Sequence, residues 1–189
     1  TMSSRSGKRT FIVLAVVFVA GLVVAGLFNI GLAKTNEMEF CTSCHSMKIN
    51  YEEYKETLHF KNPSGVQATC SDCHVPKQFV PKMIAKIIAA KDVYHEIIGT
   101  IDTPEKYAAH APVMKAREIA RLKANDSQEC RNCHDFDSMD FDRQEGRSAD
   151  QHDEAFDKGY TCIDCHKGIA HRLPEGYDPA KDLPPLDAE

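Results

Sequence analysis

Eight cysteines of this 189-residue chain fall into four pairs of equal spacing, and a histidine directly follows each pair. The pairs are Cys41 and Cys44, Cys70 and Cys73, Cys130 and Cys133, and Cys162 and Cys165, followed by His45, His74, His134 and His166. C-x-x-C-H is the pattern of covalent haem attachment, in which two thioether bonds hold the porphyrin and the adjacent imidazole faces the iron. Zinc sites and disulfides also use paired cysteines, but neither needs a histidine at this position. The sequence therefore predicts four haem c groups.

Four irons have eight axial positions, so the motif histidines can fill only half of them. Five histidines lie outside the motifs, and we expect four of them to be further ligands: His59, His110, His152 and His171. We leave His95 out of this set. His171 lies only five residues after His166, so we expect it to reach a neighbouring haem. The first motif is unusual, because Met47 follows its histidine by two residues whereas Phe136 holds that position after the third.

The spacing of the motifs indicates a duplication. They begin at residues 41, 70, 130 and 162, so two short steps of 29 and 32 residues flank a long step of 60. We predict one two-haem unit over residues 34–110, a second over residues 111–173, and a disordered or draped tail over residues 174–189. With no tryptophan and few long apolar runs, this part of the chain has a thin core of its own. The expected fold is mainly α, loop-rich and cored by haem.

Residues 11–33 form an uncharged apolar run. As a helix they reach about 34 Å, enough to cross a hydrocarbon layer of about 30 Å. Arg5, Lys8 and Arg9 precede the run, which predicts a cytoplasmic N-terminus over residues 1–10 and a haem domain in the periplasm. A cleavable signal peptide is the alternative, but its apolar core is usually shorter. The expected location is the cytoplasmic membrane, with a single span.

An amphipathic helix is expected over about residues 80–99. Lys82 and Lys86 lie opposite its apolar stripe, which either packs on haem edges or lies at the membrane interface. Lys91 projects within the stripe, and Asp92 lies at its edge. Asp92 either accepts protons beside a haem or forms a surface ion pair with a lysine.

A second helix is expected from Thr103 or Asp102 as cap and Pro104 as first residue, with Pro112 interrupting it. Residues 135–157 hold nine acidic residues and two arginines. This segment is either a solvated loop or a docking surface for a basic redox partner. We expect no nucleic-acid partner. Gly21 and Ala25 form a small-x-x-x-small pair that would allow two copies to pack as a homodimer.

The segments FCTSCHSM, CSDCHVP, AAKDVY, SQECRNCH and TCIDCHKGIAH resemble those of the membrane-anchored tetrahaem quinol dehydrogenases of the NapC/NirT/NrfH family. The resemblance is nearest to the NapC/NirT branch and covers nearly the whole chain. In the NrfH branch a Met at the position of Met47 ligates the first iron, so the resemblance implies either Met47 or His45 as that ligand. It also implies that Asp92 stands over the open side of that haem. It also implies a lysine in a quinol pocket, for which Lys86 is the first candidate and Lys82 the next, with Lys91 beside Asp92.

The resemblance further implies that the protein oxidises menaquinol or ubiquinol and passes electrons to a periplasmic reductase, with nitrate reductase as the first expectation. This is electron transfer without group-transfer chemistry. A pentahaem nitrite reductase is the second expectation for the partner. Two rival functions are a soluble multihaem carrier whose leader is removed, and a reductase that acts at its own open haem.

Replacing Met47 by Ala should perturb one haem and spare the other three, because the thioether sulfur is expected on one iron only. Absorption and electron paramagnetic resonance spectra of the purified variant measure this. Four unchanged haem spectra would show that Met47 has a packing role only.

Overall fold

The computed structural model describes all residues except 1, 174, 176 and 178–189, so most of the predicted tail lies outside the described residues. The described chain contains helices and no strand, which confirms the mainly α, loop-rich expectation. The elements are α1 Met2–Lys34, α2 Met38–Cys41, α3 His45–Lys55, α4 Cys70–His74, α5 Phe79–Ile97, α6 Pro104–Ala124, α7 Gln128–Arg131, η1 Phe136–Ser138, η2 Phe141–Arg143, α8 Gly146–Asp157 and α9 Cys162–Cys165.

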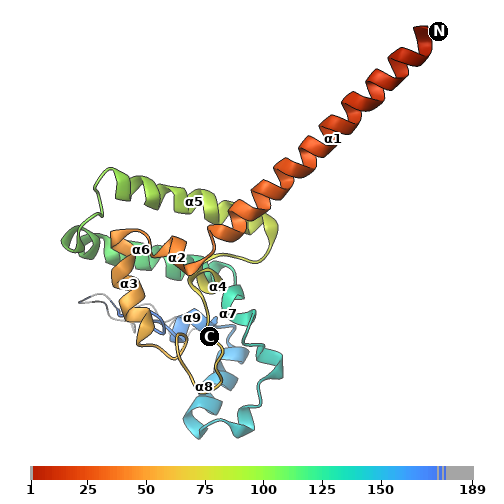
Figure 1. Cartoon of the computed structure of the whole chain (residues 1–189). Helices are drawn as coiled ribbons and strands as arrows, with labels where there is room; N and C mark the ends of the chain where they lie inside the picture. Colours follow the sequence, from red (N-terminus) through yellow and green to blue (C-terminus); the bar gives the residue numbers. More distant parts are fainter. Residues whose placement is uncertain (1, 174, 176, 178–189) are drawn as a thin grey trace.

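Helix α1 projects away from the rest of the protein as a single long rod (Figure 1). Within Gly7–Lys34, an 18-residue window reaches a mean hydropathy of 3.0 and is not covered by other parts of the protein, and the segment is long enough to span a membrane. A helix that is apolar all round needs an apolar environment, which here is lipid. The helix extends beyond the predicted span of residues 11–33 at both ends. At its foot, Lys34 pairs with Glu37 at 2.7 Å.

Helices α4 and α9 are single turns built on the same local sequence, T-C-x-D-C-H. In each, an aspartate reaches back to the capping threonine: Thr69 N–H donates to Asp72 at 2.7 Å, and Thr161 N–H donates to Asp164 at 2.9 Å. These capping boxes give the second motif of each predicted unit the same backbone shape.

Helix α6 starts as predicted, because the Thr103 hydroxyl accepts the Lys106 N–H at 3.3 Å and Pro104 is the first residue. The expectation that Pro112 interrupts this helix is wrong, since α6 continues through it to Ala124. Proline removes one backbone hydrogen bond, to the Ala108 carbonyl. Helix α6 packs against α3 and α9, and these contacts stabilise it despite the missing hydrogen bond.

The acidic segment 135–157 is more ordered than a solvated loop, and that part of the expectation is wrong. It folds into η1, η2 and α8, and η2 packs against α8. The rings of Phe136 and Phe141 lie 5.2 Å apart, and the ring of Phe141 lies 5.8 Å from that of His152. Apolar side chains between the acidic residues therefore organise this segment.

The polypeptide's own core is small, as the sequence indicates. Among the described residues the buried hydrophobic side chains are Tyr54, Ile101, Ile119 and Ile163. A chain of this size that buries so little apolar surface falls short of the usual driving force for folding. A haem-cored fold, in which large apolar cofactors contribute that surface, fits this composition.

Candidate functional site

The first cysteines of neighbouring motifs lie together in pairs. The thiol of Cys41 lies close enough to that of Cys70 to lower the pKa of Cys41, and the thiol of Cys130 acts on Cys162 in the same way. All eight cysteines are free thiols, and each is at least partly accessible. Within the described part of the chain, no cluster of three or more His, Cys, Asp or Glu side chains could hold a bare metal ion. The first cysteines of the four motifs therefore form two neighbouring pairs.

The second cysteines of the motifs lie outside these two thiol pairs. Cys44 is partly exposed and precedes α3 as its cap residue. Cys133 is exposed, and its N–H donates to the Cys130 carbonyl at 3.1 Å. Cys165 is also exposed and Cys73 is partly exposed, and partial burial raises the pKa of both thiols. The two cysteines of a motif thus differ in surroundings: the first lies beside a neighbouring motif, and the second is exposed in the third and fourth motifs.

Ser127 joins the third and fourth motifs. It is fully buried, with a left-handed backbone at φ 49°, and its hydroxyl accepts the Ile163 N–H at 3.1 Å. Lys123 adds an ion pair to Asp164 at 2.6 Å. The segment before Cys130 and the turn that starts at Cys162 are therefore held in one arrangement.

Three motif histidines each face a histidine from another part of the chain. The ring centroids lie 6.2 Å apart for His74 and His171, 6.2 Å for His134 and His59, and 6.0 Å for His166 and His152. With metal–imidazole bonds of about 2 Å on each side, two axial imidazoles on one iron have centroids about 6 Å apart. The three pairs therefore fit axial ligation of a haem iron.

Burial favours the neutral form, which binds a metal, for three of these imidazoles by lowering their pKa. It lowers the pKa of His59 and His166, and it lowers the pKa of His171 to about 4 with help from nearby His74 and Lys115.

The backbone around His59 is fixed by one tyrosine. The Tyr54 hydroxyl contacts the carbonyls of His59, at 2.9 Å, and of Ala68. The Ala68 N–H donates to the same His59 carbonyl at 3.0 Å. This closes the loop that presents His59 to His134.

A glycine turn returns His171 toward the second motif. Gly168 has φ 83°, a conformation that L side chains rarely adopt, and a Cβ there would come within 3.3 Å of Leu173. The structure thus places His171 beside His74 and away from its own motif.

His110 and His95 do not join a motif histidine in this way. His110 is exposed on α6, and its Nδ1 lies 2.8 Å from the Lys106 carbonyl. His95 contacts Thr100 and the ring of Tyr94. Among the described residues, neither ring faces an imidazole of the four motifs.

The first motif differs from the other three. His45 begins α3, and its backbone N–H donates to Glu96 of α5 at 3.0 Å. No second imidazole ring is paired with His45 in the described structure, and Met47 is 37% exposed. The contact of Glu96 with His45 could not be predicted from the sequence, because the two residues are 51 positions apart and Glu96 lies in none of the motifs. The first motif therefore depends on α5 for its placement.

Helix α5 lies at the foot of the membrane anchor (Figure 1). The Lys86 ammonium donates to the carbonyl and the hydroxyl of Thr35, each at 2.8 Å. Burial and nearby Lys82 lower the pKa of Lys86, while the Cys41 thiol acts in the opposite direction. Lys86 thus stands between the anchor and the first haem motif.

Asp92 pairs with Arg117 of α6 at 3.3 Å, and not with a lysine as the surface alternative expected. This contact leaves both side chains about half exposed. Lys82 is partly exposed and Lys91 is exposed. The structure brings Lys82 close to Lys86.

The apolar stripe of the predicted 80–99 helix is uncovered in the structure. Its members are all exposed: Val80, Ile84, Ile87, Ile88, Tyr94 and Ile98. The chain itself does not bury this face.

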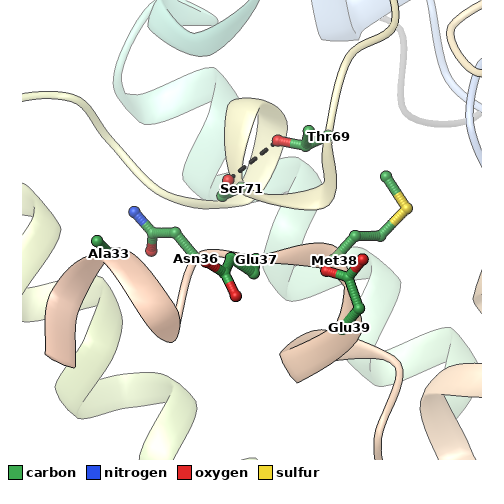
Figure 2. Close-up of a pocket in the computed structure, with 7 residues that line it drawn as sticks. All are labelled: Ala33, Asn36, Glu37, Met38, Glu39, Thr69 and Ser71. Carbon is green, nitrogen blue, oxygen red and sulfur yellow. Dashed lines mark hydrogen bonds between the residues drawn. The ribbon is translucent and has the colours of Figure 1, made fainter. Parts of the chain in front are cut away.

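An open pocket of about 440 Å³ lies between the foot of α1 and the second motif. Figure 2 shows Asn36, Glu37 and Met38 on one side and Thr69 and Ser71, which flank Cys70, on the other. Its lining includes none of the four residues predicted for the quinol site, and we assign it no function.

Replacing His59, His152 or His171 by Ala, one at a time, should convert one low-spin haem to high spin in each variant, because each is expected on one iron. Electron paramagnetic resonance of the purified proteins measures the spin states. His95→Ala is the matched control and should keep the wild-type spectrum. A single His variant that leaves all haems low-spin would remove that residue from the ligand set.

Comparison with known proteins identifies the family. Residues 3–176 match the model of the NapC/NirT cytochrome c family, N-terminal region. The chain is 52% identical to a tetraheme cytochrome-c type protein of Allochromatium vinosum, over 94% of this chain and 97% of the relative. It is 55% identical to the cytochrome c-type protein NapC of Escherichia coli K12, over 84% and 80%.

It is also 52% identical to the denitrification system component NirT of Stutzerimonas stutzeri, over 87% of this chain and 82% of the relative. No solved structure matches the chain. Four haem-attachment motifs, three facing histidine pairs and an apolar anchor agree with these matches, and the chain belongs to the NapC/NirT family of c-type cytochromes.

Proposed function

We propose that this membrane-anchored tetrahaem cytochrome oxidises quinol at the membrane and passes the electrons to a periplasmic reductase. The observation that carries the proposal is the position of the first motif. Cys41 lies close to the end of α1, and Lys86 of α5 bonds to Thr35 at that same end. A redox group attached there is within reach of a lipid-soluble donor.

The ligand sets follow from the facing histidines. We assign His74 and His171 to the haem of the second motif, His134 and His59 to that of the third, and His166 and His152 to that of the fourth. Met47 is the proposed ligand of the first iron, in place of His45. When bound, each haem supplies one-electron redox chemistry at its motif.

These assignments link the two predicted units, residues 34–110 and 111–173. His59 belongs to the first and pairs with His134 of the second, and His171 of the second pairs with His74 of the first. Helix α6 also runs across the boundary between the units. We therefore propose that the duplication is real in the sequence and that both units fold as one body.

Helix α5 is proposed to lie in the membrane interface. Its exposed stripe would enter the acyl boundary, where apolar area is favoured. The foot of α1, which α5 contacts through Lys86, fixes the depth at which the helix meets the bilayer. This position makes the first motif the one nearest to quinol.

Asp92 is the proposed proton acceptor. Quinol oxidation releases two protons with two electrons, so a base is needed at the site. Arg117 holds the Asp92 carboxylate in place, and the half-exposed pair leaves a route for protons to water. Lys86 and Lys82 are proposed to bind the quinol oxygen, with Lys91 contributing positive charge beside Asp92.

Nitrate reductase is the partner that we propose first. The acidic segment 135–157 is the proposed docking surface, because charge complementarity speeds encounters between redox proteins. Residues 1–10 are proposed to lie in the cytoplasm, since basic residues precede the span. Packing of two anchors through Gly21 and Ala25 stays a prediction.

Rival functions are separated by simple measurements. Co-purification of a pentahaem nitrite reductase would replace nitrate reductase as the partner. A mature protein that starts beyond residue 30 would favour a soluble carrier. Turnover of nitrite or hydroxylamine by the isolated protein, with an artificial reductant, would favour a reductase that acts at its own haem.

Replacing Asp92 by Asn should slow haem reduction by quinol about 10²-fold, the low end of what a positioned acid–base group contributes. Stopped-flow absorbance of the full chain in lipid nanodiscs measures the rate, and reduction by dithionite should stay at the wild-type rate. Asp102→Asn is the matched control, because Asp102 is also half exposed and paired, with Lys106 at 2.8 Å.

If quinol reduces the haems equally slowly in Asp92→Asn and Asp102→Asn, the slowing would come from the change in net charge and not from a specific role of Asp92. Unchanged quinol kinetics in Asp92→Asn would remove Asp92 from the site.

A further inference from the structure

The imidazole of His74 is bonded to a carboxylate that comes from another helix. Its Nδ1 lies 3.0 Å from Oε1 of Glu118, which is on α6 and 44 residues further along the chain. No motif in the sequence contains Glu118. The contact leaves the opposite nitrogen, Nε2, as the one available to an iron.

Glu118 is itself held by Arg121 of the same helix. The Arg121 guanidinium donates to Glu118 through Nε at 3.1 Å and through Nη2 at 2.7 Å. A two-point contact of this kind fixes both the position and the charge of a carboxylate.

Arg121 also connects the second and third motifs. Its Nη2 donates to the Cys73 carbonyl at 3.0 Å, and its Nη1 donates to Glu129 at 2.8 Å. Glu129 is 4% exposed and directly precedes Cys130, and Asn125 donates to it at 2.8 Å. The Glu118 carboxylate is therefore part of a partly buried network of charged groups that joins the second and third motifs.

The other histidine pairs have different outer partners. Nδ1 of His152 lies 2.6 Å from the neutral amide oxygen of Gln144. Nδ1 of His171 is buried and has no hydrogen-bond partner in the described structure. Among these three proposed ligands, His74 alone is bonded through Nδ1 to a full negative charge.

We propose that Glu118 is a positioning residue for His74. It holds the His74 imidazole with the proton on Nδ1 and makes this imidazole a stronger electron donor to the haem of the second motif than it would be without the carboxylate. This inference rests on the proposed ligand set. A carboxylate bonded to a metal-ligating imidazole fixes its tautomer and orientation and raises its basicity. A more basic ligand favours the ferric over the ferrous state, so Glu118 lowers the reduction potential of one haem of the four.

Glu118→Gln keeps the size of the side chain and removes its charge. We expect four attached haems and a shift of at least about tenfold toward the ferrous state for one of them, which is about 59 mV for a one-electron couple. Spectroelectrochemical titration of the full chain measures the four potentials, and electron paramagnetic resonance measures the g values of the affected haem. Glu118→Asp should restore part of the wild-type potential.

Glu129→Gln is the matched control, because Glu129 binds the same Arg121 but does not contact His74. It should leave the g values of that haem unchanged and shift its potential less. Gln144→Glu is an independent test at another pair, and it should lower the potential of a different haem by bonding a charge to His152.

Unchanged potentials and g values in Glu118→Gln would overturn the inference. So would an equal shift in Glu129→Gln, because the effect would then be one of charge at a distance. If Glu118→Gln does not fold, an unchanged haem potential in Gln144→Glu would contradict the inference that a carboxylate bonded to a ligand histidine lowers the potential. None of these readouts uses quinol, so failure of the proposed function appears separately, as normal potentials with no reduction by quinol.

Discussion

Imidazole rings that face each other about 6 Å apart are the constraint on which the rest of this domain depends. Each of the three pairs joins a motif histidine to a histidine outside the motifs, and two of the pairs join the two predicted units. The polypeptide core is too small to impose this arrangement through apolar burial. Local devices do so instead: the Tyr54 contacts around His59, the Gly168 turn before His171, and the buried Ser127 between motifs.

The first motif, at the membrane end of the protein, is positioned by different contacts. There the first motif has no facing imidazole among the described residues, and α5 contacts it through Glu96 while contacting the anchor through Lys86. Two polar contacts thus join α5 to the first motif and to the foot of the anchor. In the proposed function, this arrangement gives the first haem an open side for quinol, whereas paired imidazoles close the other three and leave them to carry electrons.

The sequence was sufficient wherever the signal was local. The four motifs, the apolar anchor, the extent of α5 and the start of α6 at Thr103 each rest on residues a few positions apart. The errors came from tertiary contacts. Pro112 stays within α6 because packing holds the helix, and the acidic segment folds because Phe136 and Phe141 pack together.

The partners of the site residues could not be predicted for the same reason. Arg117 beside Asp92, Glu96 beside His45 and Glu118 beside His74 are separated from their partners by 25 to 51 residues. Spacing in one sequence carries no information on such contacts. The free histidines could be nominated because four irons need ligands, but their pairing required the fold.

The most direct test of the account is a count of haem spin states in the full chain in lipid nanodiscs, with and without a quinol analogue. Electron paramagnetic resonance should show three low-spin haems with two imidazole ligands and one distinct haem, and only the distinct signal should change when the analogue binds. Four equivalent bis-imidazole haems that do not respond to the analogue would contradict it.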